Sequence, residues 1–360
     1  ILMDFSFFKN KKIFISGHTG FKGSWLCFWL NKLGAEVYGF SDIEYDTPSA
    51  FNSMNIKSFL KSDLRGDISN FEEINNALNE INPDIVFHLA AQALVGKSIK
   101  DPLHTFKVNS LGTLNIAYAL SDMSNQIIFV CITSDKVYEN FEWIWGYREN
   151  DTLGGKDPYS ASKAMAELGL RALFKTHLKN TTNLKIAVAR AGNVIGGGDW
   201  SEDRIVPDAM KAWKKNNVLK LRSPNSTRPW QHVMEPIGGY LFLAKWLADV
   251  ENLNDIEAFN FGPKTDQNIS VLELVKGLSS KWDGSEIKIL ESDSLSKSEA
   301  GLLRLNCDKS HKILNWEAKL NFSELISLTS DWYKSFYFKN DDCSAITDIQ
   351  ISNYQKKLET

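Results

Sequence analysis

The chain reads Lys12-Ile13-Phe14-Ile15-Ser16-Gly17-His18-Thr19-Gly20-Phe21-Lys22-Gly23-Ser24-Trp25-Leu26 near its start, and this stretch decides the fold. Residues 12–16 are a mostly apolar run with the length of a buried strand, and residues 24–33 have the composition of a helix. Between them, Gly17, Gly20 and Gly23 recur at three-residue spacing. The stretch predicts a strand, a tight glycine-rich turn and a helix.

A turn of this kind suits an anionic ligand. Glycines let the backbone approach a pyrophosphate, and the N-terminus of the following helix faces its negative charge. The spacing is G-x-x-G-x-x-G rather than the G-x-G-x-x-G of the ordinary dinucleotide fingerprint. A glycine-rich turn without a ligand is the alternative, so the turn is judged by the residues further along the chain.

Strand and helix patterns alternate through the first half of the chain, which is typical of a parallel sheet flanked by helices. Further strands are expected at 36–40, 84–89, 127–133 and 184–190, and helices at 70–79, 105–121 and 160–177. The sequence therefore predicts an α/β fold with a doubly wound parallel sheet of Rossmann type.

From Gly192 onward, prolines, tryptophans and Gly196-Gly197-Gly198 punctuate shorter elements. We expect a Rossmann domain over residues 1–190 and a smaller mixed lobe over 191–360. The helical pattern at 235–248 suggests that 235–262 returns to the first domain. The polar stretch 340–360 keeps several apolar residues, so we expect it to pack against the rest of the chain (Ile346, Ile349, Ile351 and Tyr354).

Composition excludes several classes of protein. A net charge of -3 gives no electrostatic reason to bind nucleic acid. No apolar run approaches the roughly 20 residues that span a bilayer, and lysines interrupt the apolar start too early for a signal peptide. The four cysteines and six histidines show no metal-ligand spacing, so no metal and a reducing cytoplasm are expected, with Cys27 and Cys131 buried in apolar segments.

A second motif is Tyr159-Ser160-Ala161-Ser162-Lys163, which places a phenol and an ammonium on one face of a predicted helix. A neighbouring cation favours phenolate and is expected to lower the pKa of Tyr159. Y-x-x-x-K also occurs by chance on exposed helices. Together with the glycine turn, however, it resembles the extended short-chain dehydrogenase/reductase family, whose members use a nicotinamide cofactor and hold its ribose with the lysine.

A third motif, Ser134-Asp135-Lys136, is expected at the carboxyl end of a strand, where open α/β sheets bind ligands. In the family a Ser or Thr here bonds the sugar hydroxyl that is oxidised, and Ser134 matches it. Nucleotide-sugar 4,6-dehydratases follow this residue with an acidic pair. Asp135 fits that pattern and Lys136 departs from it. An ordinary surface turn is the alternative.

The lysine at position 136, in place of the second acidic residue, is also found in one branch of the dehydratases. Ser-Asp-Lys and four longer motifs resemble the branch that acts on CDP-glucose (residues 143–149, 189–200, 204–208 and 228–236). The resemblance runs from about Lys11 to the last expected helix. It implies an NAD-dependent hydro-lyase that forms a 4-keto-6-deoxy sugar and water, with the lobe 191–360 binding the nucleotide sugar.

The resemblance also assigns roles to the catalytic candidates. Tyr159 would remove the C4 hydroxyl proton while hydride leaves C4 for NAD+, and the hydride would later return to C6. Asp135 would protonate the departing C6 hydroxyl. Lys136 occupies the position of the C5 base, and because an ammonium cannot accept a proton, we hypothesise that it works as the neutral amine, favoured by burial and by nearby positive charge.

The cofactor contacts are expected from the same resemblance and from the residues that follow the second expected strand. After Phe40 come Ser41-Asp42-Ile43-Glu44, with no cation to meet a 2′-phosphate, so NAD is favoured over NADP. Ser41 and Asp42 are both candidates for the contact with the ribose. Asn109 is expected to brace the active-site helix. The remaining expected cofactor contacts are Gly17, Thr19, Gly20, Phe21, Lys22, Gly23, Ser41, Asp67, Ile68, Leu89, Ala90, Ala91, Tyr159 and Lys163.

Substrate contacts are expected just beyond the sheet, because arginine forks suit a diphosphate. Asn193, Arg204, Arg228 and His232 are the candidates. The aromatic segment 141–147 is expected to cover the sugar, with a core or dimer role as the alternative. Helices 110–121 and 160–177 form the homodimer interface in proteins that this chain resembles, although their apolar residues would equally serve packing within one chain.

Two other classes of protein share parts of this pattern. A nucleotide-hexose 4-epimerase would share the glycine turn, Tyr159 and Lys163 but would need no proton-transfer pair after Ser134. A non-catalytic, nicotinamide-sensing regulatory protein could keep the fold with a dead site. Such proteins usually lose the tyrosine or the lysine, and both are present here.

Overall fold

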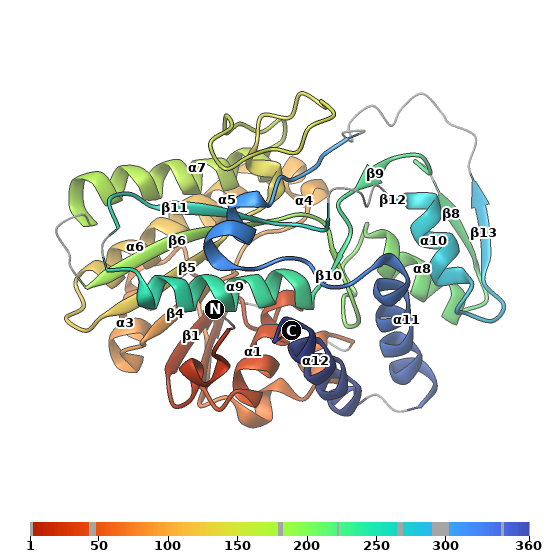
Figure 1. Ribbon diagram of the computed structural model, residues 1–360, viewed down its shortest axis with the longest axis horizontal. Helices are drawn as coiled ribbons and strands as arrows, with labels where there is room; N and C mark the ends of the chain where they lie inside the picture. The colour runs from red at the N-terminus through yellow and green to blue at the C-terminus, as the bar shows by residue number, and fades with distance from the viewer. Residues whose placement is uncertain are drawn as a thin grey trace.

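A parallel sheet, seven-stranded in the described part of the chain, forms the centre of the computed structural model (Figure 1). Its strands are β1 (Lys12–Ser16), β2 (Glu36–Ser41), β3 (Ser62–Arg65), β4 (Ile85–His88), β5 (Ile127–Ile132), β6 (Leu184–Ala191) and β11 (Glu257–Phe261). The structure describes residues 3–42, 48–178, 183–221, 223–251, 253–264, 269–289, 302–339 and 342–359.

The strand order is β11-β6-β5-β4-β1-β2-β3, and every neighbouring pair is parallel. The chain winds outward from β1 to β3 on one side and from β4 to β11 on the other, so the winding reverses between β1 and β4. A crevice for ligands opens at the carboxyl ends of the strands beside such a reversal. The doubly wound Rossmann-type sheet predicted from the sequence is confirmed.

Side chains alternate between two core layers along each strand. Ile13 and Ile15 face the layer of α1 (Phe21–Lys32) and α9 (Met234–Asp249), whereas Phe14 faces the opposite layer. That layer holds α3 (Phe71–Ile81), α6 (Gly112–Ser121) and α7 (Pro158–Leu173). Each large apolar side chain fully buried there contributes about 1.5–3 kcal/mol to folding.

Two helices depart from their expected bounds. Helix α1 begins at Phe21 rather than at residue 24, because Gly20 takes the N-cap and Gly23 already lies in the first turn. The helix expected at 105–121 is α5 (Pro102–Phe106), a π-helical turn (Lys107–Leu111) and α6. A π-helical turn inside a helix often marks a functional position, and Asn109 lies in this one.

The smaller lobe stands at one end of the sheet (Figure 1). Its described residues form three two-stranded pairs and three longer helices. These are β7 (Val194–Ile195) with β10 (Gln231–His232), β8 (Val218–Leu221) with β13 (Glu286–Ile289), β9 (Thr227–Arg228) with β12 (Ile269–Ser270), α8 (Ile205–Lys214), α10 (Val271–Ser279) and α11 (Phe322–Phe338). The segment 234–261 leaves this lobe, and its strand β11 pairs with β6 in the main sheet.

Helix α12 (Ser344–Leu358) packs back onto α1 and α9 (Figure 1). Tyr354 meets Trp29 at a ring-centroid distance of 5.8 Å and donates a hydrogen bond of 2.5 Å to the buried Glu235. Ile351 is also buried, whereas Ile349 is exposed. The expectation that residues 340–360 pack against the chain holds for the described part of this stretch, 342–359.

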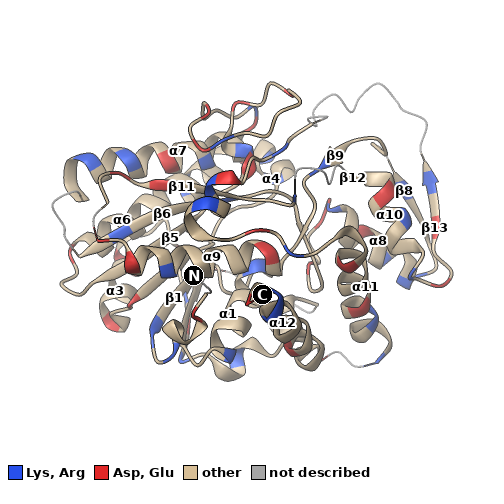
Figure 2. Ribbon diagram, viewed as in Figure 1, with Lys and Arg blue, Asp and Glu red and all other residues tan. Residues whose placement is uncertain are grey.

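Charge and surface features match the composition. Basic and acidic residues are interspersed over the helices and over the smaller lobe (Figure 2). Among the described residues, no helix is both long enough and apolar enough to cross a membrane, and no cluster of histidine, cysteine and carboxylate side chains is arranged to hold a metal ion. The thiols of Cys27 and Cys131 are buried, as expected.

Candidate active site

The glycine turn after β1 is packed so tightly that two of its glycines are required. Gly17 has a φ of +78°, and a Cβ on it would lie 2.6 Å from the backbone nitrogen of Ala90. A Cβ on Gly23 would lie 2.1 Å from the carbonyl oxygen of Gly17. Because the N-cap of α1 is Gly20, no N-cap side chain occupies the N–H groups of its first turn. The turn therefore joins β1, α1 and the end of β4 around the backbone N–H groups at the start of α1.

The neighbouring predicted contacts fall along the same edge of the sheet. Thr19 and Ser41 share a hydrogen bond of 2.9 Å between their hydroxyls. Asp67 lies 3.6 Å from the ammonium of Lys107, and Ile68 is buried. The residues Ile43 and Glu44, which contributed to the choice of NAD, lie outside the described residues.

Asn109 links the β4 end to α7. Its Oδ1 accepts from the backbone N–H of Gln92 at 2.8 Å, and its Nδ2 donates to the Gln92 carbonyl at 3.0 Å and to Ser162 Oγ at 2.9 Å. Gln92 follows Leu89-Ala90-Ala91, and Ser162 precedes Lys163. Asn109 is therefore placed to brace the helix that carries the tyrosine and the lysine.

Ser134, Asp135, Lys136, Tyr159 and Lys163 converge at the carboxyl ends of the central strands. Ser134 hydrogen-bonds with the Tyr159 phenol and donates to Asp135 Oδ1 at 3.0 Å. Asp135 also lies in the field of the Lys136 ammonium. Lys163 Nζ donates to the Ile132 carbonyl at 3.3 Å, at the end of β5. One phenol, one alcohol, one carboxyl and two amines thus meet in one place.

Asp135 has the environment of a proton donor. Burial raises its pKa, and the opposing effects of Lys136, the Ser134 hydroxyl and Arg228 do not cancel that shift. Its Oδ2 has no hydrogen-bond partner among the described residues. A Cβ on Gly192 would lie 3.2 Å from this oxygen, so glycine leaves the carboxyl its space.

The pKa of Tyr159 differs from the sequence expectation. It is raised, because burial outweighs the opposing effects of the Ser134 hydroxyl and the charge of Arg204. Lys163 is itself buried, with a lowered pKa, and its Nζ donates to the Ile132 carbonyl. The structure therefore does not show Lys163 lowering the pKa of Tyr159.

Lys22 brings a further amine to the cluster. Burial lowers its pKa to about 7, and the positive charges of Lys163 and Arg204 act in the same direction, against Asp135. The glycine turn and the turn Asp135–Val137 (the catalytic turn) are therefore electrostatically coupled through this side chain. A motif assignment based on glycine spacing gave no sign of this coupling.

The structure brings only some of the four candidate substrate contacts to this group of side chains. Arg204 is held by Asp199 at 3.0 Å and, like Arg228, lies close enough to influence the catalytic groups. Asn193 directly follows Gly192 at the same edge. His232 is not brought to this group, because its ring is fully buried against Trp25, at 5.7 Å.

The aromatic segment 141–147 has an inner and an outer part. Tyr147 is buried and stacks on Tyr138 at 5.0 Å, with Trp143 next to it at 5.1 Å. Phe141 and Trp145 are more than half exposed, at 64% and 69%. Its inner part therefore packs in the core, as the alternative interpretation expected.

The sequence did not lead us to predict that Glu167 and Arg190 form a pair. They form an ion pair with both side chains fully buried, between α7 and β6. The spacing of Tyr159, Lys163 and Glu167 at successive i+4 positions was the available signal.

Comparison with known proteins identifies the class. The model of the GDP-mannose 4,6 dehydratase family matches residues 14–329, and the chain belongs to this family, a group of nucleotide-sugar enzymes with the extended short-chain dehydrogenase/reductase fold. More specifically, it is similar to the CDP-glucose 4,6-dehydratase of Salmonella typhimurium, with 38% identity over 98% of both chains.

Solved structures show the same fold. A UDP-glucose 4-epimerase from Stenotrophomonas maltophila, solved with bound NAD, has a TM-score of 0.77 at 20% identity, covering 91% of this chain and 99% of its own. A dTDP-glucose 4,6-dehydratase from Bacillus anthracis, in complex with NAD, has a TM-score of 0.71 at 19% identity, covering 90% and 96%. At these identities the likeness concerns the fold alone.

Proposed function

We propose that this protein converts a nucleotide-activated glucose, CDP-glucose, into the 4-keto-6-deoxy sugar and water. The observation that carries the proposal is the placement of Asp135 and Lys136 beside the Ser134–Tyr159 pair. An epimerase needs proton transfer at C4 alone, whereas elimination of water also needs an acid and a base at C6 and C5. The similarity to the Salmonella dehydratase supports the choice of cytidine.

The residues present fit NAD as cofactor. The uncapped first turn of α1 and the close approach of Gly17 to Ala90 form a pyrophosphate cradle. Ser41 at the end of β2 would meet the adenosine ribose, and Lys163 the nicotinamide ribose. When bound, NAD+ supplies a hydride acceptor that takes the C4 hydrogen and returns it at C6.

Tyr159 and Ser134 act on the C4 hydroxyl. Ser134 would orient that hydroxyl, and Tyr159 would take its proton as the C4 hydrogen leaves. Because the pKa of Tyr159 is raised, the bound substrate and cofactor, with Arg204 nearby, would have to favour the phenolate. The resulting 4-ketone makes the C5 hydrogen acidic.

Asp135 and Lys136 complete the elimination. Lys136 would take the C5 proton, the C6–O bond would break, and the Asp135 proton would go to the departing hydroxyl to form water. The raised pKa of Asp135 suits this donor role. Arg204, Arg228 and Asn193 would hold the diphosphate and the nucleotide.

A homodimer is the assembly that we propose, through α6 and α7. Leu111, Tyr118, Met165 and Leu168 are all 45% or more exposed, and Met165 and Leu168 share one face of α7. Leu168→Glu should convert dimer to monomer in light scattering, whereas Ile349→Glu, at an exposed site on α12, should not. A wild-type monomer would contradict the assembly.

The activity is tested by incubating the purified protein and NAD+ with CDP-glucose, UDP-glucose and dTDP-glucose. A 4-keto-6-deoxy sugar from CDP-glucose, identified by mass and by NMR, is the expected product. An isomeric hexose that retains its C6 oxygen would instead indicate epimerisation, and no change in any sugar would favour a binding role.

A further inference from the structure

A buried ion pair between Glu167 and Arg190 links α7 to β6. Glu167 follows Lys163 by one turn of α7, and Arg190 projects from β6. The guanidinium donates three hydrogen bonds to the carboxylate, from Nε at 3.0 and 3.1 Å and from Nη2 at 2.5 Å. Both side chains are fully buried. Burying such a pair is costly unless its remaining donors and acceptors are satisfied.

One of these remaining groups is satisfied by the residue just before Ser134. Thr133 donates from Oγ1 to Glu167 Oε1 at 2.7 Å. The preceding residue, Ile132, accepts from Lys163 Nζ at 3.3 Å. Two side chains of α7 therefore fix the chain where β5 ends and Ser134 begins.

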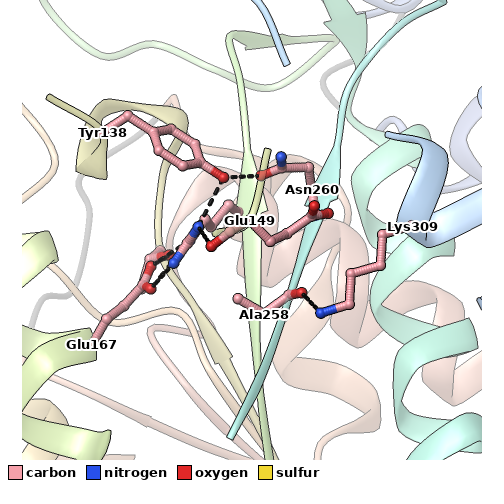
Figure 3. Close-up of polar contacts among 8 residues, drawn as sticks. Tyr138, Glu149, Glu167, Ala258, Asn260 and Lys309 are labelled. Carbon is pink, nitrogen blue, oxygen red and sulfur yellow. Dashed lines mark hydrogen bonds and ion pairs between the residues drawn. The ribbon is translucent and has the colours of Figure 1, made fainter. Parts of the chain in front are cut away.

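The other flank is held by Arg190. Its Nη1 donates to the Tyr138 hydroxyl at 2.8 Å and to the Glu149 carbonyl at 3.0 Å, and its guanidinium lies 4.8 Å from the centre of the Tyr138 ring. The Tyr138 hydroxyl in turn donates to Asn260 Oδ1 on β11 at 2.7 Å (Figure 3). Tyr138 follows Lys136 by two residues.

The catalytic turn between these flanks is short, and its buried Val137 packs with Tyr138 and Tyr147. Asp135–Val137 is a single 3-10 turn whose N-cap is Ser134, with a hydrogen bond of 3.2 Å from the Lys136 N–H to Ser134 Oγ. Tyr159 and Lys163, by contrast, stand on the sixteen-residue helix α7. Loosening the flanks would therefore displace Asp135 and Lys136 more than it displaces Tyr159.

We propose that Glu167 and Arg190 are positioning residues for the elimination half of the reaction. Through Thr133 on one side and Tyr138 on the other, they hold both ends of the turn so that Asp135 faces C6 and Lys136 faces C5. This inference rests on the proposed function. On this inference, Glu167 and Arg190 hold the acid Asp135 and the base Lys136 in position, whereas Tyr159 is held by helix α7 itself.

The test removes one hydroxyl from each flank and leaves the ion pair intact. Thr133→Val deletes the bond to Glu167, and Tyr138→Phe deletes the bonds to Arg190 and Asn260, without leaving a buried charge unpaired. Tyr147→Phe is the matched control, because its ring stacks on Tyr138 while its hydroxyl bonds Phe141 and Asn140 in the loop.

The readout is the kinetic isotope effect on kcat with CDP-glucose deuterated at C4 or at C5. We expect kcat to fall about tenfold in each flank variant with KM unchanged, since small misplacements of reacting groups cost this much. The isotope effect at C5 should grow while that at C4 shrinks. The control should match the wild type in kcat, in KM and in both isotope effects.

Two results would overturn the inference. One is an unchanged kcat in both flank variants, and the other is a loss of kcat accompanied by a larger isotope effect at C4, which would place the defect in the oxidation. Failure of the proposed function is distinguishable, because the wild-type protein would then release no water from any of the nucleotide sugars.

Discussion

Replacing Glu235 by glutamine should remove a large part of the pH dependence of stability. The carboxyl is buried at the start of α9 and joins three segments. Its Oε1 accepts from the backbone N–H groups of Lys319 and Leu320, at 2.9 and 2.6 Å, and its Oε2 accepts from the Tyr354 hydroxyl. A glutamine has the same shape and resembles the protonated acid.

The magnitude follows from the pKa of this group. Burial raises the pKa of Glu235 from 4.5 to about 7, against the hydrogen bonds that favour the carboxylate. The folded protein therefore binds the proton more tightly than the unfolded chain does. The associated stability is present below pH 4.5 and is lost as the pH rises to about 7; at about 1.36 kcal/mol per pKa unit this amounts to about 3 kcal/mol.

The assay is urea unfolding at a series of pH values across this window. The free energy of unfolding of the wild type should fall toward pH 7 by about 3 kcal/mol more than that of Glu235→Gln. Glu251→Gln, at an exposed carboxyl, is the control and should follow the wild type. Parallel curves for the wild type and Glu235→Gln would refute the reasoning.

Three further predictions concern the active site. Asp135→Asn should accumulate a 4-keto sugar that keeps its C6 oxygen, with water release slowed by about 10²–10⁴-fold as for a lost general acid; unimpaired water loss would remove Asp135 from that role. Lys136→Ala should abolish exchange of the C5 hydrogen with deuterated solvent, and exchange at the wild-type rate would show another base. Because the pKa of Lys22 is about 7, its charge is lost as the pH rises from 6 to 8, so calorimetry should show NAD+ binding weakening over this range in the wild type and not in Lys22→Met.

Continuous apolar strands and glycine punctuation made most of the sheet predictable. The strand at 12–16 and the crevice beside it follow from local sequence alone, because a buried parallel strand needs an apolar run. The start of α1 did not follow, since Gly20 and Gly23 look like loop residues although one caps the helix and the other lies inside it. Short β3 carries the polar sequence Ser-Asp-Leu-Arg and gave no strand pattern of its own.

Within the site, contacts between residues far apart in the sequence could not be predicted. Tyr159 and Lys163 are recognisable because they share one helix face. Arg190 and Glu167 lie on different elements, and the sequence does not reveal that an arginine at the end of a strand turns inward to a carboxylate rather than outward to a diphosphate. His232 shows the converse, because a histidine in a polar motif is buried against Trp25.

The packing of α12 on α1 has a consequence during synthesis. The indole of Trp29 and the Glu235 carboxyl obtain their partner Tyr354 only when residues 344–358 have left the ribosome. Until then the nascent Rossmann layer leaves apolar surface open to water or to a chaperone. Removal of residues 344–358 should therefore cause the newly made chain to aggregate, although these residues lie far from any reacting atom.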